Sequence, residues 1–126
     1  MKIRVCDRKE LEATDVDEEH ALKTKKRVVF SPDNNWDSHV MRVFTLEEGG
    51  KTLPHSHDWP HWVYVLAGRG ELVTEEENYK LERDTYVFVP AGIKHNFASR
   101  GEGLFEFMCI VPPEGDKFKE EEGEKP

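Results

Sequence analysis

Residues 49–68 read GGKTLPHSHDWPHWVYVLAG, and residues 84–95 read DTYVFVPAGIKH. The first block carries His55, His57 and His61 between glycines, and the second places His95 directly after a Pro-Ala-Gly turn. Alternate residues of a strand share one face, so His55 and His57 can point the same way. Neutral imidazole is the commonest protein ligand for first-row metals. The spacing therefore predicts that all four rings meet at one metal ion.

The residues around the histidines favour β structure over a helical metal site, because short apolar runs alternate with polar residues between Gly and Pro turns. In the run after the corner at 58–60, His61, Val63 and Val65 form the expected inward face, with Trp62, Tyr64 and Leu66 outward. The sequence predicts an antiparallel β-barrel with little helix and a polar stretch at 7–26. The expected strands are 3–6, 27–30, 40–46, 55–57, 61–66, 70–74, 78–81, 85–89, 94–98 and 104–110.

The two blocks resemble the paired motifs of the cupin superfamily, in the same order along the chain. The resemblance implies an all-β, single-domain fold, the double-stranded β-helix or jelly-roll barrel. It extends to small single-domain manganese tetra-histidine cupins, which share a His-Ser-His-x-Trp-x-His run, here His55 to His61, with a preceding Met-Arg-x-Phe-Thr segment at 41–45 and a Cys-containing last strand at 107–111. The resemblance thus implies manganese held by His55, His57, His61 and His95.

One departure from the broad family pattern bears on chemistry, because the usual metal-binding glutamate is replaced by His61. A divalent metal would then have no anionic protein ligand, so molecules bound to it would be more strongly polarised. The same change removes a carboxylate base, which favours redox chemistry or a proton acceptor from elsewhere. We expect one divalent transition metal per chain, manganese first and iron second, although the Irving–Williams order favours copper, nickel or zinc.

The inward apolar residues predict a pocket for a small apolar or aromatic molecule, and these residues are Val63, Val65, Phe107, Cys109 and Val111. Cys109 is a candidate modulator beside the metal, or else a small buried hydrophobe. Arg42 is a candidate cationic anchor if its side chain points inward, and otherwise an exposed strand charge. His20 and His39 lack motif context and are expected to be surface or hydrogen-bonded residues rather than ligands.

These features predict a dioxygenase-like oxidoreductase in which four histidines leave two of six coordination positions open. The alternative from another class is a non-catalytic cupin that senses a small molecule or a metal with the same cavity. A sugar isomerase or epimerase is disfavoured, because the apolar pocket offers few hydrogen-bonding side chains.

Composition limits the partners. A net charge of -8 and a pI near 5.2 argue against nucleic-acid binding. No apolar stretch approaches the roughly 18 residues of a membrane span, so we expect a cytoplasmic protein with reduced Cys6 and Cys109. The charged fraction of 35% and the absence of Gln are typical of thermophile proteins.

The chain length suits one domain. We expect a cupin barrel over 1–112, including the N-terminal strand, and a charged, mobile tail over 113–126. The outward residues Trp62, Tyr64 and Leu66, together with the N-terminal strand, predict a homodimer.

Overall fold

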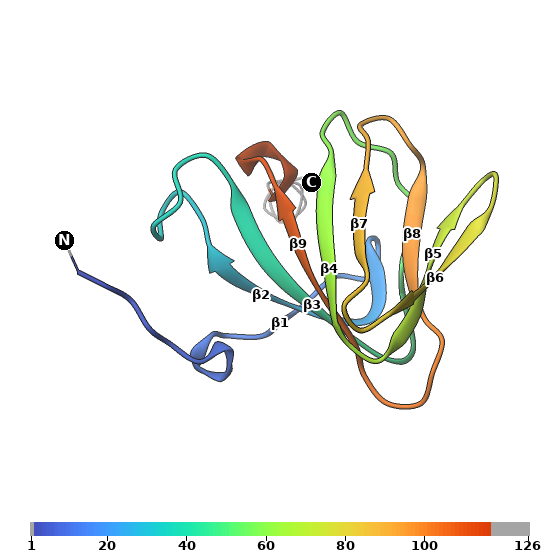
Figure 1. The fold of residues 1–126 in the computed structure, drawn as a ribbon, viewed down its shortest axis with the longest axis horizontal. Helices are drawn as coiled ribbons and strands as arrows, with labels where there is room; N and C mark the ends of the chain where they lie inside the picture. The colour runs from blue at the N-terminus through green and yellow to red at the C-terminus, as the bar shows by residue number, and fades with distance from the viewer. Residues whose placement is uncertain (1, 117–126) are drawn as a thin grey trace.

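The computed structural model describes residues 2–116 and shows an antiparallel β-sheet that curls into a barrel (Figure 1). No α-helix occurs among these residues, and none of their elements is a helix long and apolar enough to cross a membrane. The strands are β1 (Thr14–Asp15), β2 (Ala21–Phe30), β3 (Val40–Thr52), β4 (His61–Ala67), β5 (Arg69–Thr74), β6 (Asn78–Glu82), β7 (Tyr86–Val89), β8 (His95–Ser99) and β9 (Phe105–Val111). Two short 3-10 turns, η1 (Arg8–Glu10) and η2 (Pro113–Asp116), lie near the ends of the described chain.

The sheet runs in the order β6-β5-β8-β3-β9-β4-β7, with β2 also paired to β3 and β1 to β2. β3 holds the barrel together, because its first seven residues pair with β9 while Lys51 near its end pairs with Ala98 of β8. β7 bonds only to β4, so it forms one edge of the sheet.

The core fills the inside of this curl, because alternate residues of each strand turn inward. β4 shows the alternation directly: Val63 and Val65 are buried, whereas Trp62 and Tyr64 are about two-fifths exposed. The largest fully buried side chains are Phe105, Phe107, Leu46, Leu81, Val65 and Val111.

Two turns of the sequence blocks have a backbone geometry that limits which residues they accept. Asp84 adopts a φ of 74°, a left-handed conformation that glycine adopts more easily. Gly68 has a φ of 78°, and a Cβ there would clash with the Leu104 carbonyl, so this corner accepts no side chain.

The structure confirms the all-β fold but differs from several of the predicted elements. Residues 3–6 form no strand, and Ile3 and Val5 are 92% and 90% exposed, because no described element pairs with them. β2 begins at Ala21 rather than at residue 27, because the largely polar residues before 27 also pair with β3. Residues 55–57 form only an isolated bridge, His55 to His95.

The first four residues of the predicted tail form a defined element. Residues 113–116 fold into η2, where Gly115 is buried, rather than starting a mobile segment. The rest of the predicted tail, residues 117–126, lies outside the described residues, as does residue 1.

Candidate metal centre and pocket

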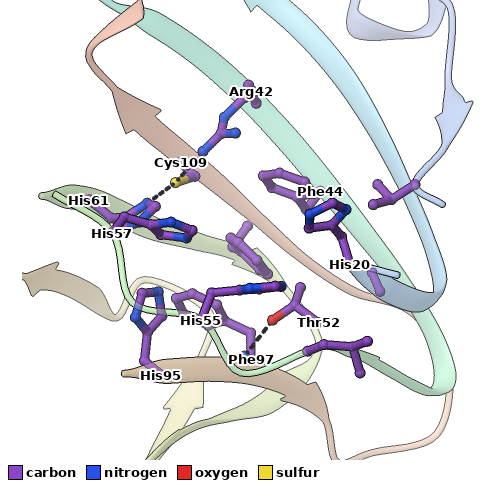
Figure 2. Close-up of a pocket in the computed structure, with 14 residues that line it drawn as sticks. His20, Arg42, Phe44, Thr52, His55, His57, His61, His95, Phe97 and Cys109 are labelled. Carbon is purple, nitrogen blue, oxygen red and sulfur yellow. Dashed lines mark hydrogen bonds between the residues drawn. The ribbon is translucent and has the colours of Figure 1, made fainter. Parts of the chain in front are cut away.

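The four predicted histidines come from three parts of the chain and surround one cavity (Figure 2). His61 opens β4, His95 opens β8, and His55 and His57 lie on the segment that joins β3 to β4. The backbones of His55 and His95 bond to each other in both directions, with N–O distances of 3.1 and 3.0 Å. This bridge brings the two sequence blocks together.

The ring separations match the spacing of imidazoles around a single ion. Ring centroids are 5.7 Å apart for His55–His57, 5.3 Å for His57–His61, 6.1 Å for His57–His95 and 5.0 Å for His61–His95. With metal–nitrogen bonds of about 2.1 Å, centroids of two rings on one ion lie about 4.7 to 6.6 Å apart, depending on the angle between them. The centroid distances therefore fit a shared metal.

Hydrogen bonds on two of the rings leave the opposite nitrogens for a ligand. His95 Nδ1 lies 2.8 Å from the Ile93 carbonyl oxygen; the carbonyl can only accept, so Nδ1 carries the proton. His61 Nδ1 lies 3.5 Å from Cys109 Sγ. The Nε2 atoms of His55 and His61 are buried with no hydrogen-bond partner among the described residues. Buried polar atoms are normally paired, so these two nitrogens indicate a missing partner such as a metal.

All four histidines are held neutral, which is the state that binds metal. Burial, together with the nearby histidines and Arg42, lowers the pKa of His61 to about 3 and that of His57 to about 4. Burial also lowers the pKa of His55 and His95. Protons therefore compete weakly with a metal at neutral pH.

The rings are gathered but not yet arranged as a ligand set. Within residues 2–116, no three His, Cys, Asp or Glu side chains already converge as a group able to hold a metal. The stacked pair His55–His57, with planes at 24°, shows why: both rings face each other rather than a common centre. Metal binding therefore requires side-chain rotation, which the centroid distances allow.

The cavity beside the histidines has a volume of about 70 Å³, and most of its exposed wall is made of apolar atoms, although five histidines, Arg42 and Thr52 are among the lining residues. At about 10–15 Å³ for each water-sized sphere, it admits a small group or one end of a molecule. Of the predicted pocket residues, Phe107 and Cys109 line it, whereas Val63, Val65 and Val111 belong to the core cluster. Phe107 and Cys109 belong to the same core cluster, so an inward position does not decide which residues line the cavity, and the substrate-binding role of all five residues stays a prediction. The apolar lining residues that the sequence analysis missed are Val16, Ala21, Phe44, Leu53 and Phe97.

Arg42 points inward, which resolves its predicted alternatives. Its side chain is 2% exposed, and its guanidinium donates to Asp116 Oδ1 at 3.1 Å and to Cys109 Sγ at 3.1 Å. The cation is therefore already paired with a carboxylate, which it shares with Lys26. Cys109 is buried, and burial raises the pKa of its thiol although Arg42 opposes this.

His20 is hydrogen-bonded, one of its two predicted alternatives, and it also lines the cavity, which the sequence analysis did not expect. Its ring lies 5.1 Å from the ring of His55, and its Nδ1 is 3.1 Å from Asp17 Oδ1. His20 directly precedes β2, whose pairing of Ala21 with Thr52 carries it to the cavity. No local spacing signals this contact. His39, by contrast, packs against Trp36 and Trp62, away from the cavity lining.

A cupin domain family model matches residues 42–111, which run from within β3 to the end of β9 and include the four predicted histidine ligands. The chain belongs to the cupin family. The match covers the barrel, and so the cupin fold expected from the two sequence blocks is confirmed.

The relatives of this cupin differ in activity. The polyketide cyclase RemF from Streptomyces resistomycificus has a similar structure, with a TM-score of 0.82 and 29% identity over 90% of this chain and 80% of that one. The 1-methylthio-D-xylulose 5-phosphate methylsulfurylase of Rhodospirillum rubrum is 27% identical over 92 residues, 73% of this chain and 58% of that enzyme. A predicted oxalate decarboxylase from Thermotoga maritima shares only the fold, with a TM-score of 0.77 and 15% identity over 86% of this chain and 98% of that one. Family membership alone therefore leaves the reaction open.

Proposed function

We propose that this cupin is a metal-dependent enzyme that oxidises a small apolar or aromatic molecule in a dioxygenase-like reaction. The observation that carries the proposal is the pair of buried, unpartnered Nε2 atoms of His55 and His61 beside an apolar cavity. The ligands would be His55, His57, His61 and His95, with manganese as the first candidate, iron second, and copper, nickel or zinc as alternatives. A divalent metal among neutral imidazoles supplies a strongly polarising positive charge.

The protein's own residues would bind the substrate and exclude water. The rings of Phe97 and Phe107 lie 4.5 Å apart, and that of Phe44 lies 5.4 Å from Phe107, so a planar apolar group can pack against them. His20, held by Asp17, adds a polar side chain to the lining. The small cavity fits one end of a substrate beside the histidines.

Cys109 would modulate this chemistry rather than attack the substrate. Its thiol is 2% exposed, and burial raises its pKa, so a nucleophilic thiolate is disfavoured. It lies 3.5 Å from His61 Nδ1, close enough to affect that ring. Arg42, paired with Asp116, contributes positive potential rather than a free anchor for a substrate.

A second candidate is a redox-neutral cyclisation, which the similarity to a polyketide cyclase favours. One assay separates the candidates: metal-loaded protein is mixed with a panel of aromatic and polyketide-like compounds while dissolved oxygen and product masses are followed. Oxygen uptake with an oxygenated product supports the oxidation, whereas loss of water without oxygen uptake supports the cyclisation. Tight binding without turnover would contradict both and support the non-catalytic sensor.

We also propose that the protein forms a homodimer through the outer face of β4 and β7. The register pairs Trp62 with Phe88 and Tyr64 with Tyr86, so four aromatic side chains share that face. They are between 38% and 81% exposed. An exposed patch of this kind is typical of an interface between subunits.

A further inference from the structure

We propose that the C-terminal turn η2 is a positioning element for the metal site, which fixes the rings of His61 and His57 through two separate contacts. The inference rests on the proposed metal site. It concerns residues 113–116, which follow the family-matched barrel and carry none of the ligands.

The first contact is a chain of polar groups that runs from the turn to His61. Asp116 Oδ1 accepts hydrogen bonds from Lys26 Nζ at 2.8 Å and from Arg42 Nη1 at 3.1 Å. Both cations are buried, at 6% and 2% exposure, so the carboxylate of the turn compensates two charges inside the barrel. Arg42 Nη2 then donates to Cys109 Sγ, which lies 3.5 Å from His61 Nδ1 (Figure 2).

This chain matters because the ring of His61 has a weaker local support than that of His95. A backbone carbonyl 2.8 Å away fixes His95, whereas the ring of His61 has a hydrogen-bond partner only in the Cys109 thiol within the described part of the chain. The thiol is in turn bonded to Arg42, whose Nε has no partner among residues 2–116. The guanidinium is therefore held by its hydrogen bonds to Cys109 and Asp116. A shift of Asp116 would be transmitted through Arg42 and Cys109 to the His61 ring.

The second contact runs through Trp59. The indole of Trp59 stacks on His57 with centroids 4.8 Å apart and planes at 5°. A Cβ added at Gly115 would lie 2.8 Å from Trp59 Nε1 and 2.8 Å from Val111 Cβ, so the glycine backbone lies against the indole edge. Trp59 Nε1 is buried and makes no hydrogen bond with any described residue. The orientation of the Trp59 indole, against which the His57 ring stacks, is therefore fixed by packing, including the packing of Gly115.

Groups that orient metal-binding histidines typically change metal affinity about 10- to 100-fold when they are altered. Asp116→Asn removes the charge that holds Arg42, and Gly115→Ala pushes a methyl group against Trp59. Two matched controls exist. Asp15→Asn removes an equally short ion pair, Asp15 to Lys25 at 2.8 Å, on the exposed surface. Gly101→Ala adds a methyl group that meets no atom closer than 3.4 Å.

The experiment titrates the full chain and each variant with Co²⁺ alone, and records the dissociation constant and the visible absorption spectrum together with thermal unfolding of the metal-free protein. We expect about 10- to 100-fold weaker binding and an altered spectrum for Asp116→Asn and Gly115→Ala, and wild-type values for both controls. The spectrum is decisive, because a merely structural role would lower the unfolding temperature and leave the ligand geometry of the folded protein unchanged.

Wild-type affinity and spectrum in both turn variants would overturn the inference, as would a change in unfolding temperature alone. If Asp116→Asn does not fold, Gly115→Ala decides by the same criteria. A wild-type chain that binds no Co²⁺ would overturn the proposed metal site itself, whereas equal binding by wild type and turn variants would overturn only the role of the turn.

Discussion

Metal-free protein should lose stability when the solution is acidified from about pH 7 to about pH 5, because folding keeps His61 neutral. Burial lowers the pKa of this histidine from 6.5 to about 3 in the folded chain. The unfolded chain therefore takes up the proton first, and acid favours unfolding. The contribution of His61 is fully present above about pH 6.5 and is lost progressively down to about pH 3.

The magnitude follows from the linkage relation. At about pH 5 the unfolded form gains about 2 kcal/mol from protonating a group with a pKa of 6.5, while the folded form gains almost nothing. This loss of free energy depends little on the pKa of His61 in the folded chain, provided that this pKa lies well below 5. His57, whose pKa is lowered to about 4, adds a contribution of similar size, because at about pH 5 its folded form is also mostly unprotonated.

Urea unfolding of the chelator-treated protein at the two pH values measures this loss, and His61→Asn serves as the matched variant. We expect the wild type to lose about 2 kcal/mol more than the variant. A loss equal in both proteins would refute the reasoning, because carboxylates and the other histidines are shared by both. Saturating metal should protect the protein against acid, since it binds only the neutral rings.

Three further predictions concern the ligands, the pocket wall and the outer face. His57→Ala should strongly reduce metal content measured by elemental analysis, whereas His39→Ala, on the outer surface, should leave it unchanged; equal content in both would count against the site. Phe107→Ala should lower the free energy of unfolding by about 3–5 kcal/mol in urea titration, because the ring is 1% exposed, and a loss below about 1 kcal/mol would contradict its role. A double variant, Trp62→Lys with Tyr64→Lys, should sediment as a monomer while the wild type sediments as a dimer, and a monomeric wild type would refute the proposed interface.

The sequence predicted the parts of the fold that depend on local patterns. Alternation in His61 to Val65 placed the inward and outward faces of β4 correctly, because one face is buried and the other is not. The two motif blocks also indicated that four histidines would meet. In the structure, His55 pairs with His95 through a single β-bridge, whereas the sequence analysis expected a strand over residues 55–57.

The remaining errors arose where long-range pairing decides the outcome. His20 reaches the cavity because Ala21 pairs with Thr52, a contact 31 positions apart that no local spacing reveals. The wall of the cavity combines residues of β2, β3, β4, β8 and β9 with connecting segments, so an inward position on one strand did not distinguish core from pocket, as Val63 shows. Asp116 looked like part of a charged tail, and only Lys26 and Arg42 in the folded barrel explain its position.

The central claim, that His55, His57, His61 and His95 bind one metal ion, is tested most directly by a crystal structure of the metal-loaded protein with the metal identified by its X-ray absorption edge. We expect one ion per chain with a nitrogen from each of the four rings at about 2.0–2.3 Å. A structure in which His61 is turned away and a carboxylate such as Glu71 or Glu106 completes the ligand set, or in which no ion binds, would contradict the account.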